Sequence, residues 1–197
     1  MIEIFNKPKV LRAQPDAAVV LVSLEETFVA AHTIIMACEE LFRSWYVKKD
    51  IYVEFDYRIM IKDEYHRDYL DKMRQKYNYF KHADRDTDET LDVDHQQIHR
   101  LNETLLALLV HGYRKVFGEL TAPMDIYSRW LVIAYPHLIK WDNVAGGSEL
   151  RSNIEKVKNN DADKRQMLRV MLDDASVLPK EDFQFLRLWK QTLRQSR

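Results

Sequence analysis

Residues 94–118, DHQQIHRLNETLLALLVHGYRKVFG, decide the fold of this chain. From Leu101 onward apolar side chains occur on nearly every side of a helix, a pattern typical of a helix buried in a protein core. Gly118 follows the last apolar residue, Phe117, and glycine is a common helix stop because it adopts the left-handed conformation without strain. We therefore predict a deeply buried helix from about Asp94 to Phe117.

Other segments repeat the helical pattern on both sides of this one. Residues 27–46, TFVAAHTIIMACEELFRSWY, have apolar residues at helical intervals and predict a second core helix. Residues 62–82 have one polar and one apolar face, the latter including Leu70, Tyr77 and Phe80, and predict an amphipathic helix. Further helices are predicted at about 9–23 (starting near Pro15 or kinked there), 124–135, 162–175 and after Pro179.

The composition supports an all-α fold. The chain has only four glycines, which argues against a β-rich protein with many tight turns. Residues 51–61 are rich in Tyr, Phe and Ile and are compatible with a short strand or an extended segment. We expect an all-α helical bundle in residues 1–140, followed by additional C-terminal helices in residues 141–197 that pack on the bundle or on a second subunit.

Charge and targeting features limit the class of protein. Thirty basic and 31 acidic residues give a net charge of -1, so no global field attracts nucleic acid or membranes, and such a partner requires a local patch. The N-terminus, MIEIFNKPKV, lacks the pattern of a secretory signal, and no apolar run approaches the ~18 residues of a membrane span. With a lone Cys38, which we interpret as a buried structural thiol, these features predict a cytoplasmic protein without a membrane association.

The stretch richest in chemically active side chains is RQKYNYFKHADRD, residues 74–86. His82 lies at the end of the predicted helix, where a histidine can exchange protons near neutral pH. Asn78 lies four residues earlier and shares its helix face. Arg74 lies one turn further back, within reach of the same polyanion. This combination of histidine and cations suits a phosphate ligand.

Residues 77–94, YNYFKHADRDTDETLDVD, together with AAHTIIMACEELF at 30–42, resemble an uncharacterised bacterial group related to the HEPN superfamily (higher eukaryotes and prokaryotes nucleotide-binding). The resemblance covers residues 14–118. HEPN proteins are small helical bundles, many of them metal-independent ribonucleases of toxin and antiphage systems, with a signature of Arg, a polar residue that is often Asn, three variable residues and His, usually at a dimer interface. Asn78 and His82 match the signature, whereas Tyr77 occupies the position of the arginine.

The resemblance implies a homodimer that binds RNA or nucleotide in bacterial stress or defence and that, if active, is a ribonuclease. His82 would transfer protons and Asn78 would orient it. In the family the arginine stabilises the scissile phosphate, which tyrosine cannot do because it carries no positive charge. The substrate-binding residues would then be Tyr77, in the position of the arginine, and the cations of this stretch that hold phosphate, namely Arg74, Lys76 and Arg85.

A non-catalytic interpretation of His82 remains. In it His82 only caps helix carbonyls, and the chain is a non-catalytic helical interaction or oligomerisation module. His95 and His99, four residues apart, could present two imidazoles to a metal, but the pattern also fits the exposed polar start of a helix, and we expect no metal. The chain lacks a Gly-rich phosphate loop, so we expect no cofactor, and we interpret His32 as a core histidine.

Overall fold

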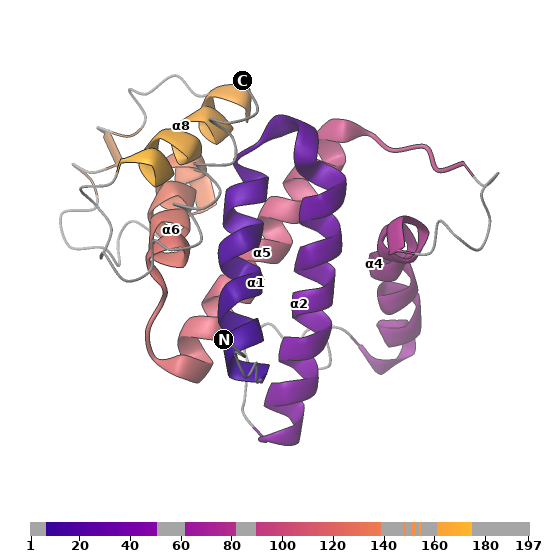
Figure 1. Ribbon diagram of the computed structural model, residues 1–197. Helices are drawn as coiled ribbons and strands as arrows, with labels where there is room; N and C mark the ends of the chain where they lie inside the picture. Colours follow the sequence, from indigo (N-terminus) through magenta and orange to yellow (C-terminus); the bar gives the residue numbers. More distant parts are fainter. Residues whose placement is uncertain are drawn as a thin grey trace, which may run out of the picture. The chain divides into compact units, whose positions relative to one another are not determined.

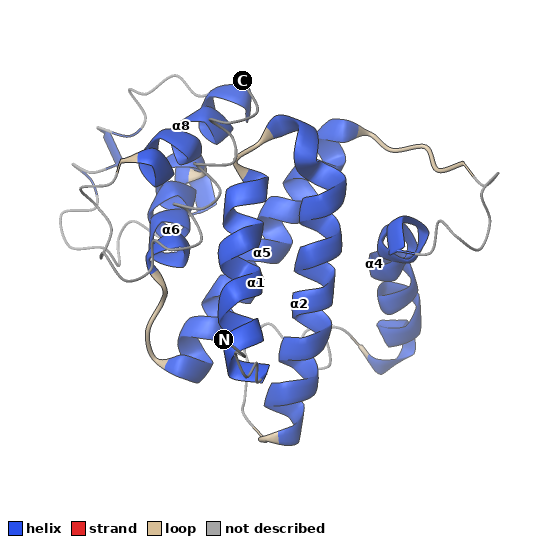
Figure 2. Ribbon diagram, viewed as in Figure 1, coloured by secondary structure: helices blue, strands red, loops and turns tan. Residues whose placement is uncertain are grey.

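The described part of the chain in this computed structural model is helical. It comprises residues 7–50, 62–81, 90–138, 148, 151, 152, 154 and 161–174, in which no strand occurs (Figure 2). The predicted all-α class is therefore confirmed. The segment 51–61, left open between strand and extended structure, and the helix predicted after Pro179 lie outside the described residues.

Three helices build the core of the first compact unit, Met1–Leu120. They are α1 (Lys7–Val22), α2 (Phe28–Lys48) and α5 (His95–Phe117), and each packs on the other two (Figure 1). Ring contacts join Phe28 to His95 at one end and Trp45 to Phe117 at the other, so α2 and α5 run in parallel. The fully buried side chains of the three helices include Leu11, Val19, Ile35, Ile98 and Leu106.

Pro15 lies inside α1, which begins at Lys7. Of the two alternatives, a helix that starts near Pro15 and a helix kinked there, the first is therefore wrong. A proline within a helix removes one backbone hydrogen bond, which costs free energy. Leu11, one turn before it, is completely buried, as is most of the apolar side from Ala18 to Val22. Core packing on both sides of the proline offsets the missing bond, an effect that local pattern alone does not reveal.

The ends of α5 lie where the sequence predicts them. The Asp94 carboxylate accepts hydrogen bonds from the backbone N–H groups of Gln96, at 2.8 Å, and Gln97, at 3.2 Å. At the other end Gly118 has a φ of 81° and donates its N–H to the Arg114 carbonyl at 2.9 Å. Both ends thus satisfy backbone groups that a helix leaves unpaired.

Gly118→Ala will lower the free energy of unfolding by about 1 kcal/mol, because a Cβ strains the left-handed conformation. No atom lies within 4 Å of the added Cβ, so this strain is the main cost. Urea denaturation monitored by circular dichroism measures the loss. Gly118→Asn, which tolerates this conformation better, should cost less; equal stability of the alanine variant and the wild type would contradict the assignment of the cap.

Helix α4 (His66–Lys81) packs on α2 and follows the short 3₁₀ turn η2 (Asp63–Tyr65). Within the first unit, α2 contacts both α1 and α4 (Figure 1). The amphipathic helix predicted at 62–82 is confirmed over the described residues. The residues that follow it, 82–89, lie outside them.

The second compact unit, Thr121–Arg197, contains α6 (Ala122–Ala134), the 3₁₀ turn η3 (Pro136–Leu138) and α8 (Asp161–Asp173). These helices confirm the segments predicted at 124–135 and 162–175. The Trp130 indole donates to the Lys164 carbonyl at 2.7 Å and so joins α6 to α8. The boundary expected at residue 140 groups α6 with the bundle, whereas the contacts group it with α8.

Candidate functional site

Tyr77 lies on the buried side of α4, the helix that packs on α2. Its side chain is 4% exposed, and the ammonium of Lys81, one turn later, lies 5.1 Å from the centre of its ring. Burying an aromatic ring contributes a large share of the packing energy of a small helix. Tyr77 thus anchors α4, and its position in the apolar repeat of residues 62–82 already indicated this.

Arg74 forms an ion pair across the α2–α4 contact. Its Nε lies 3.5 Å from Oε1 of Glu40 on α2. Both side chains are partly exposed, so the pair contributes modestly to stability, on the order of 0–1 kcal/mol. Its larger effect is that a carboxylate offsets the charge of Arg74, one of the cations that the sequence assigns to phosphate binding.

Asn78 and Lys81 are exposed at the end of α4. Arg74, Asn78 and Lys81 are spaced by four and three residues, so they are neighbours on one side of the helix; we call them the α4 stripe. Lys76 is half-buried and two residues from Asn78, so it does not face the same direction. The structure therefore groups Arg74, predicted to bind phosphate, and Asn78, predicted to orient His82, with Lys81, which was not predicted as a site residue.

His82 and Arg85 lie outside the described residues, because the described part of α4 ends at Lys81. Their predicted roles in proton transfer and phosphate binding stay predictions. Helix α4 carries more cations than carboxylates, since Asp68 and Asp71 are outnumbered by Arg67, Lys72, Arg74, Lys76 and Lys81. It is therefore a locally basic element in a chain that is close to neutral.

A buried polar pair links α2 to α5 next to this helix. Nδ1 of His32 lies 2.8 Å from Oδ1 of Asn102, and the amide nitrogen of Asn102 donates to the Phe28 carbonyl at 2.9 Å. Both side chains are almost completely buried. His32 is a core residue, as the sequence predicts, whereas its partner was not predicted; the one signal for it was an asparagine within an apolar helix.

The hydrogen bonds of Asn102 determine which nitrogen of His32 carries the proton. Because the amide nitrogen of Asn102 is used by Phe28, its oxygen faces His32 and accepts a hydrogen bond from Nδ1–H. Nε2 of the neutral ring is then an unprotonated acceptor, and it has no hydrogen-bond partner. Burial, and to a smaller extent the charge of Lys76, lowers the pKa of His32 below 6.5, although the bond to Asn102 opposes the shift.

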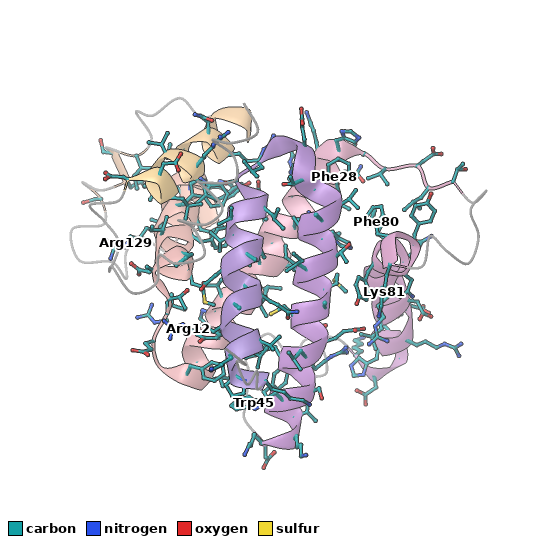
Figure 3. The ribbon with its side chains drawn as sticks, viewed as in Figure 1. Arg12, Phe28, Trp45, Phe80, Lys81 and Arg129 are labelled. Atoms are coloured by element: carbon teal, nitrogen blue, oxygen red, sulfur yellow. The ribbon has the colours of Figure 1, made fainter. Side chains whose placement is uncertain are left out.

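Phe80 of α4 covers the His32 ring. The two ring centres are 6.0 Å apart with nearly perpendicular planes, and Figure 3 shows Phe80 close to the end of α4, near Lys81. An edge-to-face contact of this kind is a favourable aromatic arrangement. The last turn of α4, which ends at the stripe residue Lys81, therefore rests on the buried histidine.

His95 and His99 pack against Phe28, at ring-centre distances of 4.6 and 5.7 Å. His95 is exposed, as expected for the start of a helix, but His99 is buried, so that interpretation is wrong for His99. Among the residues that the structure describes, no group of three His, Cys, Asp or Glu side chains could hold a metal ion.

Cys38 is a buried free thiol, as the sequence predicts. Burial raises its pKa to about 12, with smaller contributions from Glu39 and Asp16. A thiol with so high a pKa forms almost no thiolate at neutral pH, so Cys38 is not a reactive nucleophile.

No helix in the described part of the chain is long and apolar enough to cross a membrane.

Comparisons with protein families, with curated proteins and with solved structures find no match to this chain. Functional interpretation therefore rests on the residues of the chain and on their arrangement.

Proposed function

We propose that this protein binds RNA or nucleotides through the exposed side of α4, at the α4 stripe and the residues that follow it. The observation that carries the proposal is that Tyr77 is buried while Asn78 and Lys81 are exposed. Asn78 can donate and accept hydrogen bonds, and Lys81 supplies a positive charge for a phosphate. The basic character of α4 supports a polyanionic ligand.

The resemblance to HEPN proteins of bacterial stress and defence systems adds a homodimer and His82 as a proton-transferring residue to this proposal. Cleavage by the family mechanism needs a persistent cation at the scissile phosphate. Here Tyr77 is a packing residue, and Glu40 offsets the charge of Arg74. We therefore propose binding, rather than cleavage, as the activity.

Fluorescence anisotropy with labelled single-stranded and hairpin RNAs tests this proposal on the full chain. At low salt, Lys81→Glu should weaken binding about tenfold, because a phosphate contact is replaced by repulsion, and the salt dependence should become shallower. Asn78→Ala should weaken binding less. The matched control is Lys7→Glu, an equal charge change at an exposed position of α1, which should have little effect.

Several results would contradict the proposal. RNA binding that is undetectable, or equally affected by Lys81→Glu and Lys7→Glu, would remove α4 as the binding element.

A separate experiment tests cleavage: the same RNAs are incubated with the protein in EDTA, and we expect no cleavage. If the wild type cleaves RNA and His82→Ala does not, the protein is a ribonuclease despite Tyr77.

A second function has specific support. The burial of Tyr77 and the Arg74–Glu40 pair give α4 a structural role, which favours a non-catalytic helical interaction or oligomerisation module. Light scattering coupled to size-exclusion chromatography measures whether the chain forms a homodimer. A stable dimer with no affinity for any RNA tested would favour this second function.

A further inference from the structure

The environment of the buried His32 favours the neutral form of its ring. Its side chain is fully buried, Nδ1–H donates to Asn102, and Nε2 is an acceptor without a donor. Protonation would add a second N–H that has no acceptor and place a charge in an apolar site. Both effects are costly in a protein interior.

Among the described residues, the side chains of Phe80 and Asn102, which contact His32, carry no negative charge. From α4 His32 meets Phe80 and the electrostatic influence of Lys76, which opposes a second cation. From α5 it meets the neutral amide of Asn102; the titratable residues of that part of α5, His99 and Glu103, are also buried.

In the described parts of α1 and α2, the stretches beside His32 contain no other ionisable side chain. On α2, residues 28–36 contain no ionisable side chain except His32 itself. The end of α1, residues 17–22, contains none either, and Asp16 of α1 acts on Cys38, further along α2. The turn between α1 and α2 contains Glu25 and Glu26, and the side chain of Glu26 is exposed.

We propose that protonation of His32 controls the docking of α4 on α2. The neutral ring lets the last turn of α4 rest on α2 through Phe80, and the protonated ring releases α4; we call this switch the His32 latch. This inference is independent of the proposed RNA binding.

Release of α4 is the least costly response to a charge on His32. Helix α5 is capped at both ends and is largely buried, and it supplies the one hydrogen bond that the protonated ring would keep. Helix α4 meets His32 through the ring–ring contact of Phe80, which involves no hydrogen bond, and its ion pair to Glu40 is partly exposed. Moving α4 gives Nε2–H access to water without breaking the bond to Asn102.

The direction of the pH effect follows from the lowered pKa. With α4 released, His32 is solvated and titrates near 6.5, whereas with α4 docked its pKa is lower. Above about pH 6.5 protonation of His32 therefore does not weaken the docking equilibrium of α4. Below that value the docking equilibrium weakens by up to about tenfold per pH unit, until the docked form itself takes up the proton.

Amide hydrogen exchange of the full chain at pH 7.5 and 5.5, corrected for intrinsic rates, tests the latch. Protection of α4 should fall by about five- to tenfold at pH 5.5 in the wild type, whereas α5 should keep its protection. His32→Asn, whose amide can replace Nδ1–H but cannot titrate, should remove the pH dependence. The matched control, His95→Asn at an exposed position of α5, should retain it.

A second variant keeps the test decisive if His32→Asn does not fold. Lys76→Gln removes the opposing charge, so α4 should lose less protection at pH 5.5 than in the wild type. Equal protection of α4 at both pH values in the wild type would overturn the proposal. So would a loss that persists in His32→Asn or that is shared equally by α5, since that would indicate global acid destabilisation.

Discussion

Asn102→Leu will lower the free energy of unfolding by about 2–4 kcal/mol at pH 7.5, because the buried Nδ1–H group of His32 loses its partner and the partly buried Phe28 carbonyl loses a hydrogen bond. These groups are bonded to Asn102 at 2.8 and 2.9 Å. Leucine has as many side-chain heavy atoms as asparagine, branches at the same carbon and favours a helix, so neither a cavity nor helix propensity explains the loss. Urea denaturation followed by circular dichroism measures it.

Thr104→Leu is the matched control for this prediction. Thr104 is exposed on the same helix and its hydroxyl donates to the Arg100 carbonyl within that helix, so its replacement should change stability by less than about 0.5 kcal/mol. A double-mutant cycle isolates the pair. In a His32→Leu background the Nδ1–H group is already absent, so Asn102→Leu should cost at least about 1 kcal/mol less than in the wild type. Equal costs in the two backgrounds would show that the two residues are not coupled.

The helices could be predicted from the sequence because their signals are local. The apolar pattern of residues 101–117 and the stop at Gly118 correspond to α5 and its left-handed cap. Pro15 suggested a helix start that the structure does not have, because the burial of Leu11, which offsets the cost of the proline, depends on tertiary packing and not on a local signal. A local rule predicts a helix end correctly only when tertiary packing does not override it.

The candidate site was only partly predictable, because its contacts join residues that are distant in the sequence. His32 and Asn102 are 70 residues apart, and no periodicity indicates that they meet. The pairing of Arg74 with Glu40 likewise depends on how α4 packs on α2. For Tyr77, helical periodicity and family resemblance gave different predictions, an apolar-face residue and a ligand-site residue. The observed burial agrees with the periodicity.

Tyr77→Arg will destabilise the docking of α4 by about 2–4 kcal/mol rather than restore a family-like active site. The change removes a buried ring and places a guanidinium on the buried side of the helix, where it has no identified carboxylate partner. It also places a second cation one turn before Lys81, which now lies over the Tyr77 ring. Amide exchange should show protection in α4 falling by roughly thirtyfold to a thousandfold, as follows from about 1.4 kcal/mol per factor of ten.

Asn78→Arg provides the comparison that separates burial from charge. It introduces the same side chain at the next residue, which is exposed, so α4 should keep its protection to within about 0.5 kcal/mol. If Tyr77→Arg instead retains the protection of α4 and cleaves RNA in EDTA, the ring is dispensable and α4 can present an arginine to a phosphate as HEPN ribonucleases do. If it loses protection without gaining cleavage, the residue that departs from the signature serves the packing of α4, and the function of this chain must be sought in binding at the exposed side of that helix.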